Sequence, residues 1–216
     1  MDYITIGSQY LKSCLDSKKV RRALLVLVIV GVGCGGFYIN RYFKNSRQTD
    51  AIVAFNEAMQ TYMTALVTDL DFSKKGEKAA WDEVELAFGT AYDQHQKSEF
   101  APFFLIYKAQ SLAGQEKYQE AADLVGQALT GLSANSPFYD LYAIMQAALL
   151  IDGGNSAGIE QLKKLASDTN SDYVAMAQYY LAQYYLAQNQ SELAQTLFAK
   201  LATQDSSWGE LAQDYI

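Results

Sequence analysis

The stretch LIYKAQSLAGQEKYQEAADLVGQAL, residues 105–129, is repeated in outline by QYYLAQYYLAQNQSELAQTLFAKLA, residues 178–202. In both stretches a small residue is followed twelve positions later by an alanine, and four positions after that by a large apolar residue. Two antiparallel helices pack closely only where small side chains face the partner, while large ones fill the groove to the next pair. The spacing therefore predicts repeated pairs of antiparallel helices. The packing residues of the two copies are Ala109, Ala121, Val125, Ala182, Ala194 and Phe198.

A third, degenerate copy is predicted between these two. Ala121 and Ala194 are 73 positions apart, which is about two repeats of 36 to 37 residues. Gly158 stands near the expected small position, and Asp152–Ser156 (DGGNS) supplies a turn. The pattern resembles tetratricopeptide repeats, with Ala128 as the small residue near the end of the second helix. Leu201 replaces that small residue in the last copy, so an unrelated helical bundle with alanine-rich contacts stays an alternative.

Two further helices are predicted ahead of the repeats. Apolar residues recur every three or four positions from residue 52 to residue 70, which indicates one long amphipathic helix with Thr49 or Asp50 as its cap. The polar stretch DFSKKGEK, residues 71–78, reads as a loop. A second helix follows, with Trp81 and Phe88 among the residues on its apolar side.

The N-terminal part of the chain differs sharply from the rest. Residues 23–39 (ALLVLVIVGVGCGGFYI) carry no charge, and 17 apolar residues are at the lower limit of a membrane-spanning helix. Five basic residues precede the span and three follow it, which favours a cytoplasmic N-terminus. Gly31 and Gly35 lie four apart and would let another membrane helix approach closely. An uncleaved anchor is predicted, because no A-x-A cleavage pattern follows the span; lipidation of Cys34 stays open.

Charge and cysteine content exclude several functions. Residues 1–49 carry eight basic and two acidic residues, a net charge of +6, whereas the remainder carries nine basic and 22 acidic residues, a net charge of −13. So acidic a domain repels phosphate backbones, which argues against nucleic-acid binding. No cysteine follows residue 34, so neither a disulfide nor a thiolate zinc site is expected there.

No catalytic constellation is visible in the sequence. His95 is the only histidine and has no paired-ligand spacing around it. Asp82, Glu83 and Glu85 fall in the first turn of a predicted helix, where carboxylates complement the helix dipole. We therefore expect no enzyme, no metal site, no cofactor and no small-molecule substrate.

A peptide-binding groove is predicted from the repeat register. In tetratricopeptide-like geometry the first helix of each pair lines the groove, and an aromatic, amide-bearing surface without Lys or Arg would suit extended or helical polypeptide segments. The long helix of residues 50–70 could instead cover these side chains. The candidate contacts are Phe103, Ile106 and Gln110 in the first copy, with Met176, Tyr179 and Gln183 in the last.

The complete chain resembles the YfgM-type ancillary subunits of the bacterial SecYEG translocon. The features that carry the resemblance are the basic N-terminus, the glycine-rich span ending in aromatics and Arg41, a long helix, and the degenerate repeats. The resemblance implies an inner-membrane protein with a periplasmic repeat domain that works with periplasmic chaperones on clients leaving the translocon.

The expected organisation is accordingly all-α, with a single N-terminal transmembrane helix followed by a tetratricopeptide-like α-solenoid. We assign residues 1–22 to a cytoplasmic segment, 23–39 to the anchor, 40–49 to a juxtamembrane linker, 50–98 to leading helices and 99–216 to repeats. The expected function is a membrane-tethered protein–protein interaction module. A scaffold for another cell-envelope or division complex and a self-assembling structural repeat protein are the alternatives.

Overall fold

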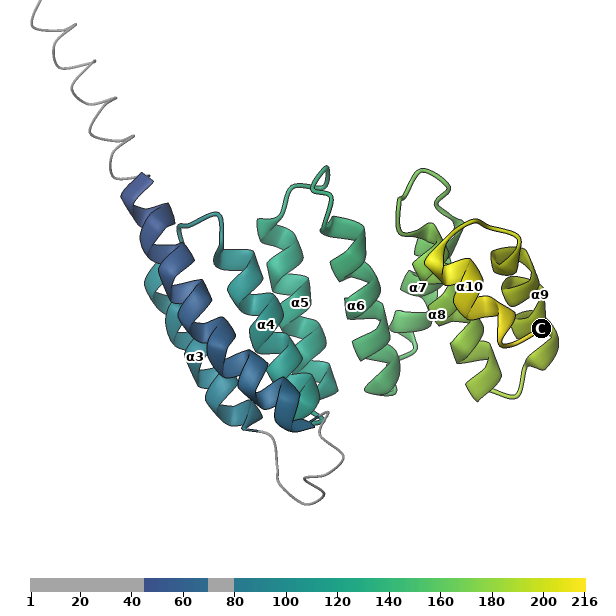
Figure 1. Ribbon diagram of the computed structural model, residues 1–216, viewed down its shortest axis with the longest axis horizontal. Coiled ribbons are helices and arrows are strands. Elements are labelled where there is room, and N and C mark those ends of the chain that lie inside the picture. The colour runs from purple at the N-terminus through teal and green to yellow at the C-terminus, as the bar shows by residue number, and fades with distance from the viewer. Residues whose placement is uncertain (1–44, 70–79) are drawn as a thin grey trace, which may run out of the picture. The chain divides into compact units, whose positions relative to one another are not determined.

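A computed structural model describes residues 45–69 and 80–216, and every regular element in these ranges is an α-helix (Figure 1). The predicted all-α class is therefore confirmed for the described part of the chain. The chain divides into two compact units, Met1–Thr49 and Asp50–Ile216, and the second contains nearly all described residues. After the helix over residues 45–69 come α3 (Trp81–His95), α4 (Ala101–Gly114), α5 (Tyr118–Gly131), α6 (Tyr139–Asp152), α7 (Ala157–Ser167), α8 (Val174–Ala187), α9 (Ser191–Ala202) and α10 (Ser207–Gln213).

From α3 onward each helix packs against the next one along the chain, and α10 also contacts α8 (Figure 1). The turns inside the pairs α4/α5, α6/α7 and α8/α9 share one backbone conformation. Each contains one residue with left-handed backbone, namely Glu116 (φ 64°), Gly154 (φ 75°) and Asn189 (φ 58°). In each, the following backbone N–H returns to a carbonyl five residues earlier: Lys117 to Leu112 at 2.9 Å, Asn155 to Leu150 at 2.8 Å, and Gln190 to Tyr185 at 2.8 Å. Such bonds satisfy carbonyls that a helix end leaves open.

Three equivalent turns give repeated helix pairs, an architecture compatible with tetratricopeptide-like repeats. The predicted packing residues, five alanines and one large apolar residue, lie at these interfaces. None of them has exposed surface: they are Ala109, Ala121, Ala128, Ala182, Ala194 and Phe198.

The middle pair, α6 and α7, uses a still smaller residue for the same purpose. Gly158 lies one position before the residue that corresponds in turn register to Ala121 and Ala194, and a Cβ added to it would meet the Ala147 carbonyl oxygen at 2.5 Å. The degenerate copy is therefore a regular helix pair with a closer approach of its two helices.

The helix over residues 45–69 begins earlier than the sequence suggested. Thr49 and Asp50, the predicted caps, lie inside the helix, and the Thr49 hydroxyl donates to the Asn45 carbonyl one turn earlier at 3.1 Å. A threonine that bonds back to its own helix in this way is satisfied without capping. Residues 45–49 of the predicted linker are thus helical.

An aromatic core joins this helix to α3 and α4. The Phe55 ring lies 5.9 Å from Phe88, 5.9 Å from Phe104 and 5.4 Å from Tyr107, in tilted or edge-on arrangements that aromatic pairs prefer. Phe88 and Phe104 are fully buried. The leading helices and α4, the first helix of the repeats, therefore share one core.

Within the described ranges no helix is both long and apolar enough to cross a bilayer. The predicted span over residues 23–39, with Gly31, Gly35 and Cys34, lies outside those ranges, as do the linker residues 40–44 and the predicted loop 71–78.

Candidate functional site

Three turns with the sequence Ser-x-aromatic precede α4, α6 and α8. They are Ser98-Glu99-Phe100, Ser136-Pro137-Phe138 and Ser171-Asp172-Tyr173. In each turn the serine carbonyl accepts the backbone N–H three residues on, at 3.2, 3.0 and 3.3 Å respectively. In the second and third turns the serine hydroxyl also accepts the N–H of the aromatic residue, at 3.3 and 3.1 Å. These short local bonds are typical of serine at turns and fix where each ring leaves the backbone.

The rings of the first two turns continue into a row that joins α4 to α6. Phe103 of α4 lies 6.1 Å from Phe100, 5.8 Å from Phe138 and 6.2 Å from Tyr142 of α6, measured between ring centroids. Phe138 and Tyr142 are 6.3 Å apart. Phe138 is 42 % exposed and the other rings are half-buried. We call Phe100, Phe103, Phe138 and Tyr142 the aromatic strip.

The electrostatics of the strip are those of uncharged rings. Burial, together with the neighbouring phenols of Tyr107 and Tyr173, raises the pKa of Tyr142 to about 12. The strip therefore offers one hydroxyl group and ring faces, and neither a cation nor an anion is among its members.

The structure separates the six predicted groove residues. Phe103 belongs to the aromatic strip. Ile106 has no exposed surface and packs in the core with Ala109 and Val125, so its side chain cannot contact a ligand in this arrangement. Gln110 is half-buried, and its side-chain oxygen has no hydrogen-bond partner among the described residues.

The second predicted triplet is covered by the end of the chain rather than by the leading helix. Tyr179 lies 5.7 Å from Phe198, 5.3 Å from Trp208 of α10 and 6.3 Å from Tyr215, and its hydroxyl accepts from Gln183 Nε2 at 3.2 Å. Tyr215 in turn stacks on Phe198 at 4.4 Å. Met176 is half-buried beside the core of α7 and α8.

The two triplets are not adjacent, because α6 lies between α4 and α8 in the order of packing. The sequence reasoning placed no candidate on α6, since its copy looked degenerate, and so missed Phe138 and Tyr142. A repeated sequence pattern could have identified these turns. Serines recur at spacings of 38 and 35 residues, each two positions before an aromatic residue: Ser98, Ser136 and Ser171.

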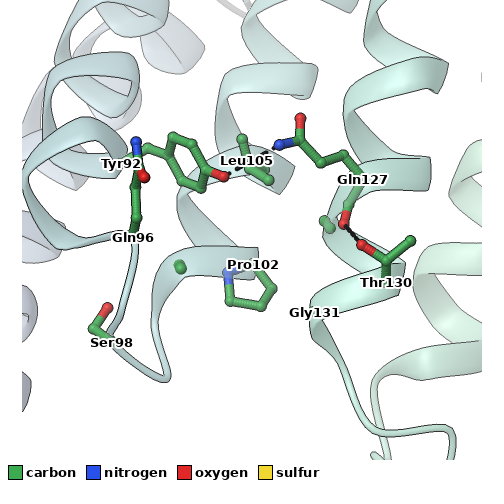
Figure 2. Close-up of a pocket in the computed structure, with 10 residues that line it drawn as sticks. Tyr92, Gln96, Ser98, Pro102, Leu105, Gln127, Thr130 and Gly131 are labelled. Carbon is green, nitrogen blue, oxygen red and sulfur yellow. Dashed lines mark hydrogen bonds between the residues drawn. The ribbon is translucent and has the colours of Figure 1, made fainter.

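A small pocket lies between the end of α3, the start of α4 and the end of α5 (Figure 2). Its volume is about 210 Å³, smaller than the ~300–1,000 Å³ of usual ligand pockets. Gln127 Nε2 donates to the Tyr92 hydroxyl across it at 3.2 Å (Figure 2). Ser98, at its edge, is 9 % exposed, and its hydroxyl has no hydrogen-bond partner among the described residues. The lining is uncharged.

One acidic residue of α3, Glu85, contacts a neighbouring turn in the described structure. Glu85 accepts from Gln115 Nε2 at 3.0 Å and lies 3.8 Å from Lys117 Nζ, so it ties α3 to the turn between α4 and α5. Asp82 and Glu83 lie in the first turn of α3. The His95 ring stacks on Phe104 at 6.2 Å. Among residues 45–69 and 80–216 no three His, Cys, Asp or Glu residues are grouped to hold a metal ion.

The fold and site together define a helical-repeat protein with an aromatic surface. Comparison with known proteins adds no family assignment, because no protein-family model and no curated sequence matches the chain.

Proposed function

We propose that the chain is a protein-binding module that holds a polypeptide segment on the aromatic strip. The observation that carries the proposal is the continuity of the strip: neighbouring rings from the turn before α4, from α4 and from the start of α6 lie 5.8 to 6.3 Å apart between centroids, across two helix pairs. Aromatic residues are enriched in protein interfaces because they supply large, rigid contact areas. An open row of rings suits an extended or helical segment.

A small-molecule function has weaker support. The pocket of Figure 2 is below the usual volume, and its lining contains no charged side chain to orient a substrate. Two larger hollows, of about 470 and 390 Å³, are lined mainly by polar and charged side chains, whereas ligand pockets are mostly apolar. Among the acidic side chains of α3, Glu85 is engaged in contacts that hold helices together. Protein binding is therefore the better account of this surface.

The membrane part of the proposal rests on the sequence. The uncharged residues 23–39 and the surplus of basic residues before them support an anchor with a cytoplasmic N-terminus. We propose that this anchor holds the repeats on the periplasmic side of a bacterial inner membrane. The resemblance to translocon subunits supports SecYEG and periplasmic chaperones or their clients as partners.

Binding to an array of short, unfolded peptides tests the interaction function. The full chain, purified in a neutral detergent, is compared with a Phe138→Ala/Tyr142→Ala variant, which removes the exposed centre of the strip. Leu193→Ala is the matched control, because Leu193 is a 51 % exposed apolar side chain on α9. We expect the strip variant to lose binding and the control to keep it, with unchanged circular dichroism in both. Equal binding by all three proteins would refute the assignment of the strip.

Protease access reports the compartment. In intact cells we expect the repeat unit to resist added protease, and to be cleaved once the outer membrane is permeabilised. Protection that persists until the inner membrane is opened would place the repeats in the cytoplasm instead.

A further inference from the structure

We propose that the helix over residues 45–69 pairs with the same helix of a second copy of the chain. The inference goes beyond the proposed function, because it uses a surface outside the aromatic strip and names a different partner. It is carried by two seven-residue patterns on this helix. The domain buries one of them and leaves the other exposed.

The buried pattern consists of three alanines at intervals of seven residues. Ala51, Ala58 and Ala65 are buried in the core that this helix shares with α3 and α4. An interval of seven residues keeps side chains on nearly one line along a helix. The alanines therefore define the side of the helix that faces its own domain.

The exposed pattern lies on the opposite side of the helix. Its members are three and four residues apart in alternation, which is the spacing of the a and d positions of a coiled coil. In that register the three buried alanines occupy the f position, which points away from the a/d seam. We call the five residues of the exposed pattern the outer seam: Val53, Asn56, Gln60, Met63 and Val67.

The outer seam combines exposed apolar side chains with uncharged amides. Val53, Met63 and Val67 are 51 %, 50 % and 61 % exposed, and Asn56 and Gln60 are exposed as well. Apolar side chains left in water at coiled-coil spacing are stabilised when a second helix covers them. The outer seam therefore has the composition of a helix-pairing surface.

Charge favours a second copy as the occupant of the outer seam. Residues 50–216 carry a net charge of −13, so two copies repel each other wherever their charged surfaces meet. The nearby carboxylates lie at the edge of the seam: Glu57 on the helix itself, and Glu83 of α3, which lines a hollow together with Gln60. Charges at the rim of an interface stay in water and cost little.

The chemistry of the seam is also self-complementary. In a symmetric pair each surface meets an identical one. A valine or methionine can pack against its own counterpart, and an amide can both donate to and accept from another amide. Asn56 and Gln60 can thus each pair with the same residue of the second copy, and polar residues inside such a seam fix its register.

The anchor of the proposed function sets the direction of the pair. Two copies held in one bilayer by their N-terminal parts run parallel, and the tether raises their effective concentration. In a parallel pair the e position of one helix lies beside the g position of the other. Glu57 would then face Ile52 of the second copy rather than another carboxylate.

Oxidative cross-linking of single cysteines tests the pairing and its direction. The full chain carries Cys14→Ser/Cys34→Ser, which removes both native thiols, and is kept in neutral detergent or lipid vesicles. Asn56→Cys places a thiol in the seam, where the two copies of a residue lie close enough for a disulfide. Glu57→Cys is the matched control, one position further and exposed but outside the seam. We expect the covalent dimer to form at least about tenfold faster with Asn56→Cys.

Light scattering of the full chain in neutral detergent measures the association itself. Met63→Glu/Val67→Glu places like charges opposite each other in the seam and should raise the dissociation constant of the dimer at least about tenfold. The matched control, Leu193→Glu/Leu211→Glu, adds two charges at exposed apolar positions of α9 and α10 and should leave the dimer intact. Circular dichroism confirms that each variant is folded.

Each outcome decides the inference. A parent chain that is monomeric at high concentration and forms no cross-link overturns it. A dimer that persists in Met63→Glu/Val67→Glu shows that another surface, such as the anchor, joins the copies, and also overturns it. Equal cross-linking through Asn56→Cys and Glu57→Cys overturns the parallel pair. Peptide binding by the aromatic strip is measured separately, so failure of the pairing leaves the proposed function standing.

Discussion

Gly158→Ala should destabilise the repeats although alanine is the better helix former. Gly158 lies in the first turn of α7, and a Cβ at this position would meet three atoms of α6. These are the Ala147 carbonyl oxygen at 2.5 Å, Leu150 Cβ at 2.8 Å and the Ile151 nitrogen at 2.9 Å. All three belong to the backbone or are attached directly to it, so no rotamer change moves them away.

The magnitude follows from two opposing terms. To lengthen the shortest contact from 2.5 Å to the 3.4 Å of ordinary contact, α6 and α7 must separate by about 0.9 Å. Overpacking of this kind costs about 1–3 kcal/mol, whereas the helix propensity of alanine returns at most ~1 kcal/mol. We expect a net loss of roughly 1–2 kcal/mol, which lowers the melting temperature of a domain of this size by roughly 2–8 °C.

Thermal and urea unfolding followed by far-ultraviolet circular dichroism measure this change. Gly89→Ala is the matched control, because Gly89 lies within α3 and a Cβ there would meet only the Lys108 side chain, at 3.5 Å or more. The control should be stabilised by up to ~1 kcal/mol. If Gly158→Ala were as stable as the parent while Gly89→Ala gained stability, the close approach of α6 and α7 would be wrong.

Three further predictions follow from single residues. Glu116→Gly should stabilise the chain by about 1 kcal/mol in urea unfolding, because Glu116 holds φ at 64°, where a side chain is strained; a loss of stability would contradict the turn geometry. Tyr142→Phe should remove one phenol that ionises near pH 12 from the ultraviolet titration. Above the ordinary pKa of 10.0 the unfolded chain loses the Tyr142 proton, whereas the folded chain keeps it until about pH 12. The free energy of unfolding should therefore fall between pH 10 and about 12, and less steeply in the variant. Gln178→Leu should lower the free energy of unfolding by about 1–3 kcal/mol, because the buried Gln178 Nε2 donates to the Ala166 carbonyl at 2.9 Å and leucine leaves that carbonyl unpaired. An unchanged melting temperature would show that this hydrogen bond does not contribute to stability.

The helical class and the pairing of helices were predictable because they depend on local spacing. Ala109, Ala121 and Ala182 stand where one helix must approach another, and a sequence displays such positions directly. The middle pair was harder to read, because its glycine and its lack of the flanking pattern looked like degeneration. In the structure the glycine reflects a closer contact rather than a weaker one.

The binding surface was less predictable because exposure depends on elements far away in the chain. The register of Tyr179 in the repeat made it a candidate contact, but Trp208 and Tyr215 pack against its ring. The sequence around Tyr179 does not predict these contacts, because both residues lie almost 30 positions or more further along the chain. Ile106 failed for the opposite reason: its own helix pair buries it. Helix boundaries were also imprecise, as Thr49 shows, because a hydroxyl that caps a helix can equally bond back inside one.

The Ser-x-aromatic turns explain why the candidate surface lies at helix starts rather than along helix faces. Phe138 follows a serine whose hydroxyl accepts its N–H, so the turn sets the direction of the ring. The ring then rests against Phe103 of the preceding pair and is still 42 % exposed. One residue thus joins neighbouring pairs and faces solvent, which leaves the helix faces free to vary. It follows that stacking and binding share side chains, and that a variant such as Phe138→Leu, which keeps an apolar side chain and removes the ring, is needed to separate the two.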